Sequence, residues 1–218
     1  MTKYMKIPKR LNKILELLPE CDLLADVGCD HGILGVAALK QKKVQRIIFT
    51  DISAPSLQKA KIYAQQNGVF DRCDFILGDG LCGRKVDCAV IAGMGAKEIL
   101  KILFDSKDLP RYLVLNPMRN ADTIRKNLAD FYFFEHDEKL YDKKYYDLLK
   151  LKLGRDCLDE LQIKYGKTNL EFFCEDFCRY LFEEQSKCVT ILNKTQNLET
   201  QQKLKEIEDL LNRSKNAG

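Results

Sequence analysis

Long hydrophobic runs are missing from this 218-residue chain. No apolar segment approaches the roughly 18 residues that a membrane-spanning helix needs, which excludes a membrane-spanning protein. The first ten residues, Met-Thr-Lys-Tyr-Met-Lys-Ile-Pro-Lys-Arg, lack the apolar centre of a signal peptide. We therefore expect a cytoplasmic protein.

Paired cysteine motifs are also missing. The chain has nine cysteines and two histidines but no C-x-x-C pair, and the cysteines are scattered through segments that resemble strands and helices. This pattern argues against a disulfide framework and against a zinc site. We interpret the cysteines as reduced, small apolar residues, and we expect no metal.

Basic residues are concentrated before residue 156. Residues 1–155 carry 27 Lys and Arg against 20 Asp and Glu, whereas residues 156–218 carry 9 against 12. Cations near the N-terminus can meet nucleic-acid phosphates, although a solvated lysine face would have the same composition. The residues of this patch that we expect to contact RNA are Lys6, Lys9 and Arg10.

Strands and helices alternate along the first 128 residues. The predicted strands are 23–27, 46–50, 73–77, 86–92 and 112–115, and the predicted helices are 8–18, 33–42, 53–67, 96–104 and 121–128. Strands separated by helices pair in parallel through right-handed crossovers. Two further strands, 131–140 and 145–153, predict a hairpin that adds an antiparallel edge. The fold class is therefore α/β, a doubly wound Rossmann-like sheet in a domain of residues 1–155.

The remaining residues have a helical pattern. From residue 170 onward the chain has no proline, and apolar residues recur every three or four positions. This spacing predicts two long helices, folded back as a hairpin near residues 193–197, in a C-terminal coiled-coil domain of residues 156–218. Such a pair of helices can alternatively serve for packing or dimerisation alone.

The most informative segment is Asp26-Val27-Gly28-Cys29-Asp30-His31-Gly32, which follows the first strand. Small residues let backbone N–H groups approach a nucleotide closely. A dinucleotide fingerprint has glycine where Asp30 stands, and a carboxylate there would repel a pyrophosphate. The turn favours the cationic amino-acid end of S-adenosylmethionine (SAM) over NAD, while an ordinary turn with chance glycines stays open.

Acidic residues also follow the next strands, where a doubly wound sheet binds its ligands. Asp51 suits ribose hydroxyls, Asp79 suits the adenine amine, and Asp26 or Asp30 suits an ammonium group. Each carboxylate can instead cap the following helix, and His31 can instead shape the floor of the site. The predicted cofactor-binding residues are Asp26, Gly28, Asp30, His31, Gly32, Asp51, Ile52, Asp79, Gly80 and Gly93.

Three motifs together resemble a known family. They are Leu-Ala-Asp-Val-Gly-Cys-Asp-His-Gly (24–32), Gly-Asp-Gly-Leu (78–81) and Val-Ile-Ala-Gly-Met-Gly (90–95). The chain resembles the TrmK family of bacterial tRNA (adenine-22 N1)-methyltransferases along essentially its whole length. The resemblance implies a class I SAM-dependent methyltransferase whose C-terminal helices hold tRNA.

The chemistry that this resemblance implies needs no nucleophilic side chain. Adenine N1 attacks the methyl group with its own lone pair, so the enzyme aligns the reactants and excludes water. The base must first be turned out of its stack. The implied catalytic residues are Asn116, which would accept from the base's amine, and Met94 and Met118, which with a nearby tyrosine would supply an apolar face. The family has Gln-Pro-Asn where this chain reads Asn116-Pro117-Met118, which keeps the amide but shortens its reach.

The expected partner is tRNA, and we expect the chain to act as a monomer. Because the tail is net negative, its RNA contacts must come from a local stripe of lysines. The further residues expected to contact RNA are Arg119, Lys187, Lys194, Lys203 and Lys205. Three alternatives stay open: a dehydrogenase, a SAM-binding and RNA-binding protein without catalysis, and a methyltransferase with another substrate.

Overall fold

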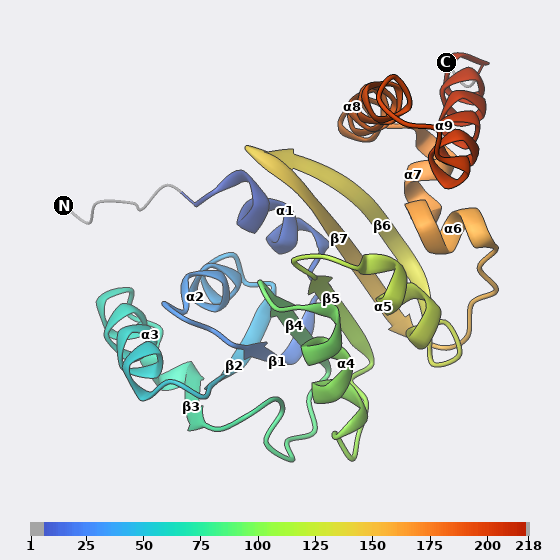
Figure 1. Ribbon diagram of the computed structural model, residues 1–218. Coiled ribbons are helices and arrows are strands. Elements are labelled where there is room, and N and C mark those ends of the chain that lie inside the picture. Colours follow the sequence, from blue (N-terminus) through green and yellow to red (C-terminus); the bar gives the residue numbers. More distant parts are fainter. Residues whose placement is uncertain (1–6, 217–218) are drawn as a thin grey trace.

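A seven-stranded sheet forms the centre of the computed structural model, which describes residues 7–216 (Figure 1). The strand order is β3-β2-β1-β4-β5-β7-β6. The strands are β1 (Cys21–Val27), β2 (Val44–Asp51), β3 (Cys73–Leu77), β4 (Cys88–Ala92), β5 (Tyr112–Asn116), β6 (Tyr132–Asp142) and β7 (Lys144–Leu153). Strands β1 to β5 pair in parallel, and β7 joins β5 antiparallel. The predicted doubly wound sheet with an antiparallel hairpin at its edge is confirmed.

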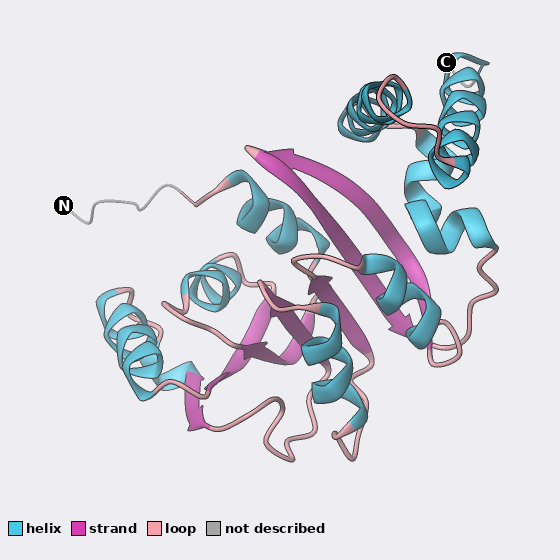
Figure 2. Cartoon of the chain, viewed as in Figure 1, coloured by secondary structure: helices cyan, strands magenta, loops and turns pink. Residues whose placement is uncertain are grey.

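Helices cover both faces of the sheet (Figure 2). One face carries α1 (Lys9–Leu17), α2 (Ile33–Lys40) and α3 (Ala54–Gln66), and the other carries α4 (Ala96–Phe104) and α5 (Ala121–Leu128). A short 3-10 helix, η1 (Phe70–Arg72), precedes β3. Neighbouring side chains of a strand point to opposite faces, so Phe49 packs in the first core and Ile48 in the second. The central strand β4 (Cys-Ala-Val-Ile-Ala), which is covered on both sides, is apolar throughout.

The winding reverses between β1 and β4, which are neighbours in the sheet although two strands separate them in the chain. The carboxyl ends of β1 to β5 lie along one edge, because Val27 pairs with Thr50 and Ile91, and Ala92 pairs with Asn116. A reversal of this kind opens a crevice outside the strand ends. The motifs of the sequence therefore meet along one edge of the sheet.

The described part of the tail, up to residue 216, contains four helices. They are α6 (Glu160–Tyr165), α7 (Lys167–Phe172), α8 (Glu175–Leu192) and α9 (Leu198–Asn216). Helices α8 and α9 pair around a core of their own that includes Phe177, Leu181 and Ile207, and the turn between them lies where it was predicted. The predicted pair of long helices from residue 170 onward missed α6 and α7, and the first long helix begins at Glu175 instead. Phe173 has φ 46°, a left-handed conformation that ends α7. The domain boundary after residue 155 stays a prediction.

A buried arginine ties the sheet to the tail. The Arg125 guanidinium on α5 donates to both oxygens of Asp137, at 2.6 and 2.8 Å, and to Oδ1 of Asp147 at 3.3 Å. It also donates to the carbonyl of Ile163 in α6 at 3.2 Å. Burial opposes ionisation of Asp147, but the charges of Lys139 and Arg125 outweigh it and hold the pKa of Asp147 below its ordinary value. The hairpin and α6 are thus joined through charged, hydrogen-bonded groups.

Three features are not found within residues 7–216. No helix there is long and apolar enough to cross a membrane. No three side chains of His, Cys, Asp or Glu gather into a group that could hold a metal ion. All nine cysteines, which lie in this range, are free thiols.

Candidate cofactor and acceptor site

The turn after β1 requires its glycines. Gly28 and Gly32 have φ of +68° and +66°, where side chains are strained. A Cβ on Gly32 would lie 2.9 Å from the Cβ of Ala60 in α3, and a Cβ on Gly28 would overlap the terminal methyl of Met94. The bare backbone of this turn is therefore enclosed by α3 on one side and by the loop after β4 on the other.

Asp26 lies buried beneath the turn. Its Oδ2 accepts a hydrogen bond of 3.2 Å from the backbone N–H of Gly35 in α2. The pKa of Asp26 is raised to about 7, because burial and, to a smaller extent, the charge of Asp51 raise it more than the bond from Gly35 lowers it. The carboxyl group therefore gains or loses its charge near neutral pH.

Asp51 connects the ends of β1 and β2. Its Oδ2 accepts from the backbone N–H of Asp30 at 3.1 Å, and its Oδ1 accepts from that of Ser53 at 2.8 Å. The next residue, Ile52, is 76% exposed. An acidic group beside an exposed apolar side chain offers a hydrogen-bond acceptor and a hydrophobic surface to the same ligand.

The remaining predicted cofactor residues stand around this edge. Asp79 is exposed, and its Oδ2 lies 3.2 Å from Nζ of Lys101. Gly80 has φ +66°, and a Cβ there would lie 2.9 Å from Ile102. His31 has a half-exposed side chain, with Nε2 3.7 Å from Oδ2 of Asp30. Gly93 has φ +81°, and no atom lies within 4 Å of its Cβ position, so it borders open space.

The loops after β4 and β5 are held together beside the glycine turn. The backbone N–H of Met118 donates to the carbonyl of Met94 at 2.8 Å, and that of Gly93 donates to the carbonyl of Asn116 at 3.0 Å. Met118 is 46% exposed. The structure therefore places Met94 beside Gly28, Asn116 at the end of β5, and Met118 on the following loop, which is bonded to Met94.

Asn116 is fully buried, and both ends of its amide are engaged. Its Nδ2 donates to the carbonyl of Asp147 at 2.8 Å. Its Oδ1 accepts from Nη1 of Arg10 at 2.7 Å, and the Arg10 guanidinium lies over the ring of Tyr146, 5.0 Å from the centroid. Arg10, which we expected on the basic surface, thus points into the molecule. No pattern in the sequence predicted this contact.

The other predicted RNA contacts are scattered. Lys9 donates to the carbonyl of Tyr141 at 3.0 Å and lies 3.3 Å from Asp176, Arg119 is exposed, and Lys6 lies outside the described residues. In the tail, Lys187 and Lys203 both bind Glu184, at 2.7 and 2.5 Å. The prediction of one lysine stripe is wrong, because Lys205 follows Lys203 by two positions and so projects from another face of α9. Lys194 lies in the turn between α8 and α9.

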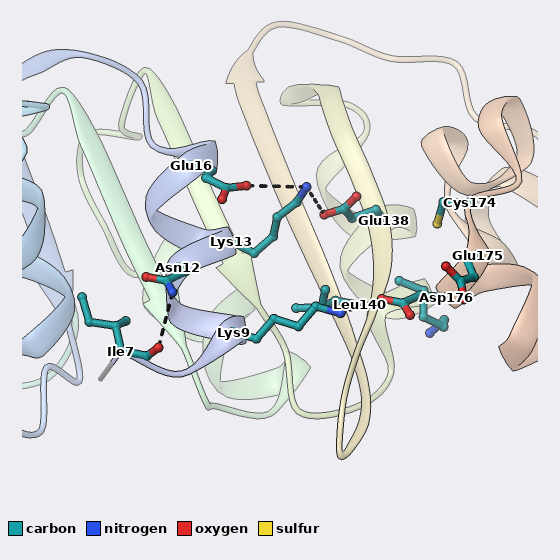
Figure 3. Close-up of a pocket in the computed structure, with 11 residues that line it drawn as sticks. Ile7, Lys9, Asn12, Lys13, Glu16, Glu138, Leu140, Cys174, Glu175 and Asp176 are labelled. Carbon is teal, nitrogen blue, oxygen red and sulfur yellow. Dashed lines mark hydrogen bonds and ion pairs between the residues drawn. The ribbon is translucent and has the colours of Figure 1, made fainter. Parts of the chain in front are cut away.

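A cavity of about 630 Å³ lies between α1, β6 and the start of α8 (Figure 3). Of the predicted site residues, only Lys9 lines it. Lys13 bridges Glu16 and Glu138, with Nζ to carboxylate distances of 3.7 and 3.1 Å. Because its cations are paired with carboxylates, this cavity does not favour an anion.

The chain is similar to known methyltransferases. The family model of a methyltransferase domain matches residues 7–149. The tRNA (adenine(22)-N(1))-methyltransferase of Bacillus subtilis is 29% identical over 223 residues, covering 94% of each chain. The crystal structure of the B. subtilis M1A22 tRNA methyltransferase TrmK superposes with a TM-score of 0.76 at 27% identity, covering 97% of this chain and 98% of that one. M. capricolum TrmK, solved with S-adenosyl-homocysteine, shares the fold, with a TM-score of 0.82 at 23% identity over 97% of this chain and 99% of that one.

Proposed function

Because this chain belongs to the methyltransferase-domain family and its resemblance to TrmK is confirmed, we propose that it methylates N1 of adenine 22 in tRNA, using SAM. One observation carries the proposal: the tRNA (adenine(22)-N(1))-methyltransferase of B. subtilis matches 94% of this chain. The match extends through the loops that form the candidate site and into the tail. A shared fold alone would not favour tRNA over another acceptor.

The cofactor half is built by the ends of β1, β2 and β3. The glycine turn brings backbone close to the ligand, Asp51 accepts from its ribose hydroxyls, and Asp79 accepts from its adenine amine. Ile52 covers the base, and Asp26 or Asp30 pairs with the ammonium group. These residue types fit SAM better than a dinucleotide, because carboxylates repel pyrophosphate. When bound, SAM supplies an electrophilic methyl group.

The acceptor half aligns the base and keeps water out. Met94 and Met118 present apolar side chains on two loops that are joined by a hydrogen bond. A flat base that packs against these side chains keeps water away from the reacting atoms. Oδ1 of Asn116, which is bonded to Arg10, would accept from the exocyclic amine and so turn N1 inward once the guanidinium leaves it. Adenine N1 carries its own lone pair, so no side chain has to remove a proton before transfer. The base is therefore positioned and not chemically activated.

The basic first 155 residues supply most of the attraction for tRNA. Exposed Arg119 lies on the loop after β5, close to the acceptor residues. We place the reaction in the cytoplasm, where tRNA is processed, and we propose that one chain suffices.

Incubation with labelled SAM and tRNA that lacks modifications tests the proposal. We expect labelled 1-methyladenosine after digestion of the tRNA. Asp51→Ala should lose transfer, whereas Asp108→Ala, on an exposed loop after α4, should retain it. Binding of SAM and tRNA without transfer would favour a non-catalytic protein, and label in another nucleoside would change the acceptor.

A further inference from the structure

The Arg10 side chain has neutral partners only. Its Nη1 donates to Oδ1 of Asn116 at 2.7 Å, and its guanidinium carbon lies 5.0 Å from the centroid of the Tyr146 ring. Among the residues that the structure describes, no carboxylate forms an ion pair with this guanidinium, although carboxylates are its usual partners. A partly buried cation that is held only by an amide and a ring can be drawn away by a fully charged group.

The orientation of the Asn116 amide is fixed by a hydrogen bond to the neighbouring strand. Its Nδ2 donates to the carbonyl of Asp147 in β7 at 2.8 Å, so its Oδ1 must face α1. Asn116 has no exposed surface, and Arg10 is the residue bonded to the side of the amide that faces α1. An oxygen that has been aimed in advance can accept from any planar N–H donor that replaces the guanidinium.

Arg10 contacts an aromatic ring and an amide oxygen, which are the two kinds of group that recognise a base turned out of its stack. Such a base is recognised by stacking on an aromatic ring and by hydrogen bonds to its Watson–Crick edge. A guanidinium and an adenine amine edge are both flat and both donate N–H groups. Tyr146 therefore provides a stacking surface, and Asn116 a hydrogen-bond acceptor, that suit the Arg10 guanidinium and an adenine base alike.

We propose that Asn116 and Tyr146 form the subsite for the target adenine, and that Arg10 fills this subsite until RNA binds. The incoming base replaces the guanidinium, which then pairs with an RNA phosphate. The backbone N–H of Arg10 stays on Oδ2 of Asp142, 3.1 Å away, so only the side chain has to turn. This inference rests on the proposed function, because it assigns the acceptor to the site described above.

Adenosine binding tests the subsite, because adenosine has the base but no phosphate. Saturation-transfer NMR with the full chain detects weak binding of the nucleoside. Arg10→Ala should bind adenosine at least about fivefold more tightly than the wild type, and Tyr146→Leu added to it should remove the gain. Purine riboside, which lacks the exocyclic amine and has no N–H group on its Watson–Crick edge to donate to Asn116, should gain much less.

Matched variants separate the two roles of Arg10. Arg84→Ala removes a cation from the opposite edge of the sheet and should leave adenosine binding unchanged. The salt dependence of tRNA affinity should fall by about one phosphate contact in Arg10→Ala but not in Arg84→Ala. Arg10→Lys keeps a charge without the planar fork, so it should keep the salt dependence and still gain adenosine affinity.

The inference is overturned if adenosine binds equally, or not at all, to wild type and to Arg10→Ala while both retain the same melting temperature. An unchanged salt dependence in Arg10→Ala overturns the transfer to phosphate. Neither readout involves methyl transfer. Methylation at adenine 22 without a gain in adenosine binding refutes this inference alone, and a gain without methylation refutes the proposed function alone.

Discussion

Replacing Asp26 by asparagine should stabilise the protein increasingly as the pH rises. The Asp26 carboxyl group is 6% exposed, and the bond from Gly35 is only a partial substitute for the water it loses on folding. Asparagine has almost the same shape and keeps an oxygen toward Gly35, but it carries no charge at any pH. The substitution therefore isolates the free energy of ionising this buried group.

The sign follows from the raised pKa. Asp26 has a pKa of about 7 in the folded protein, above its ordinary value of 3.8. The protonated carboxyl group therefore contributes its full stabilisation below about pH 4, and this contribution is lost as the pH rises through 7. At 1.36 kcal/mol per unit, the loss between pH 5 and pH 8 is about 2 to 3 kcal/mol. For a chain of this size, that corresponds to roughly 5 to 10 °C in melting temperature.

Urea denaturation of both proteins at pH 5 and pH 8 measures the effect. The difference in free energy of unfolding between Asp26→Asn and wild type should grow by that amount at the higher pH. Asp108→Asn, on an exposed loop, should follow the wild type at both values. A difference that is the same at pH 5 and pH 8 would refute the burial argument.

Three further predictions concern packing and charge. Arg125→Met should lower the free energy of unfolding by about 3 to 5 kcal/mol in urea titrations, because it leaves Asp137 and Asp147 buried without their cation. Gly32→Ala should lower the melting temperature more than Gly68→Ala, since both have positive φ but only Gly32 has a neighbour within 4 Å of its Cβ position; equal losses would contradict the contact. Neutralising Lys187, Lys194, Lys203 and Lys205 together should weaken tRNA binding more at low salt than at high salt in filter-binding assays, and unchanged affinity at both would remove the tail from the RNA site. The Lys194 and Lys205 pair should account for most of that loss, because Glu184 already binds the other two.

Much of the fold could be predicted because local signals and burial agree. The strand Cys73–Leu77 and the helices Ala96–Phe104 and Ala121–Leu128 have the predicted bounds. Apolar residues at the right period stop before Gly78, lie between Gly95 and Asp105, and begin after Asn120. The rule that ligands bind at the carboxyl ends of the strands also predicts that Asp51, Asp79 and Asn116 lie along one edge.

Contacts between distant residues could not be predicted. Arg10 and Asn116 are 106 positions apart, and their hydrogen bond depends on where α1 crosses the end of β5. The pairing of Lys203 with Glu184 depends likewise on how α9 folds back on α8. The left-handed Phe173 was missed because apolar spacing does not report φ, and an aromatic residue rarely adopts that conformation.

Reverse transcription of a treated tRNA transcript tests the central claim most directly. A methyl group on N1 blocks the Watson–Crick edge, so primer extension should stop next to position 22 after incubation with the protein and SAM. A transcript with guanine at position 22 should be read through. A stop at another position, or full-length extension of the adenine transcript despite bound SAM, would contradict the assignment of this chain as a tRNA adenine-22 N1-methyltransferase.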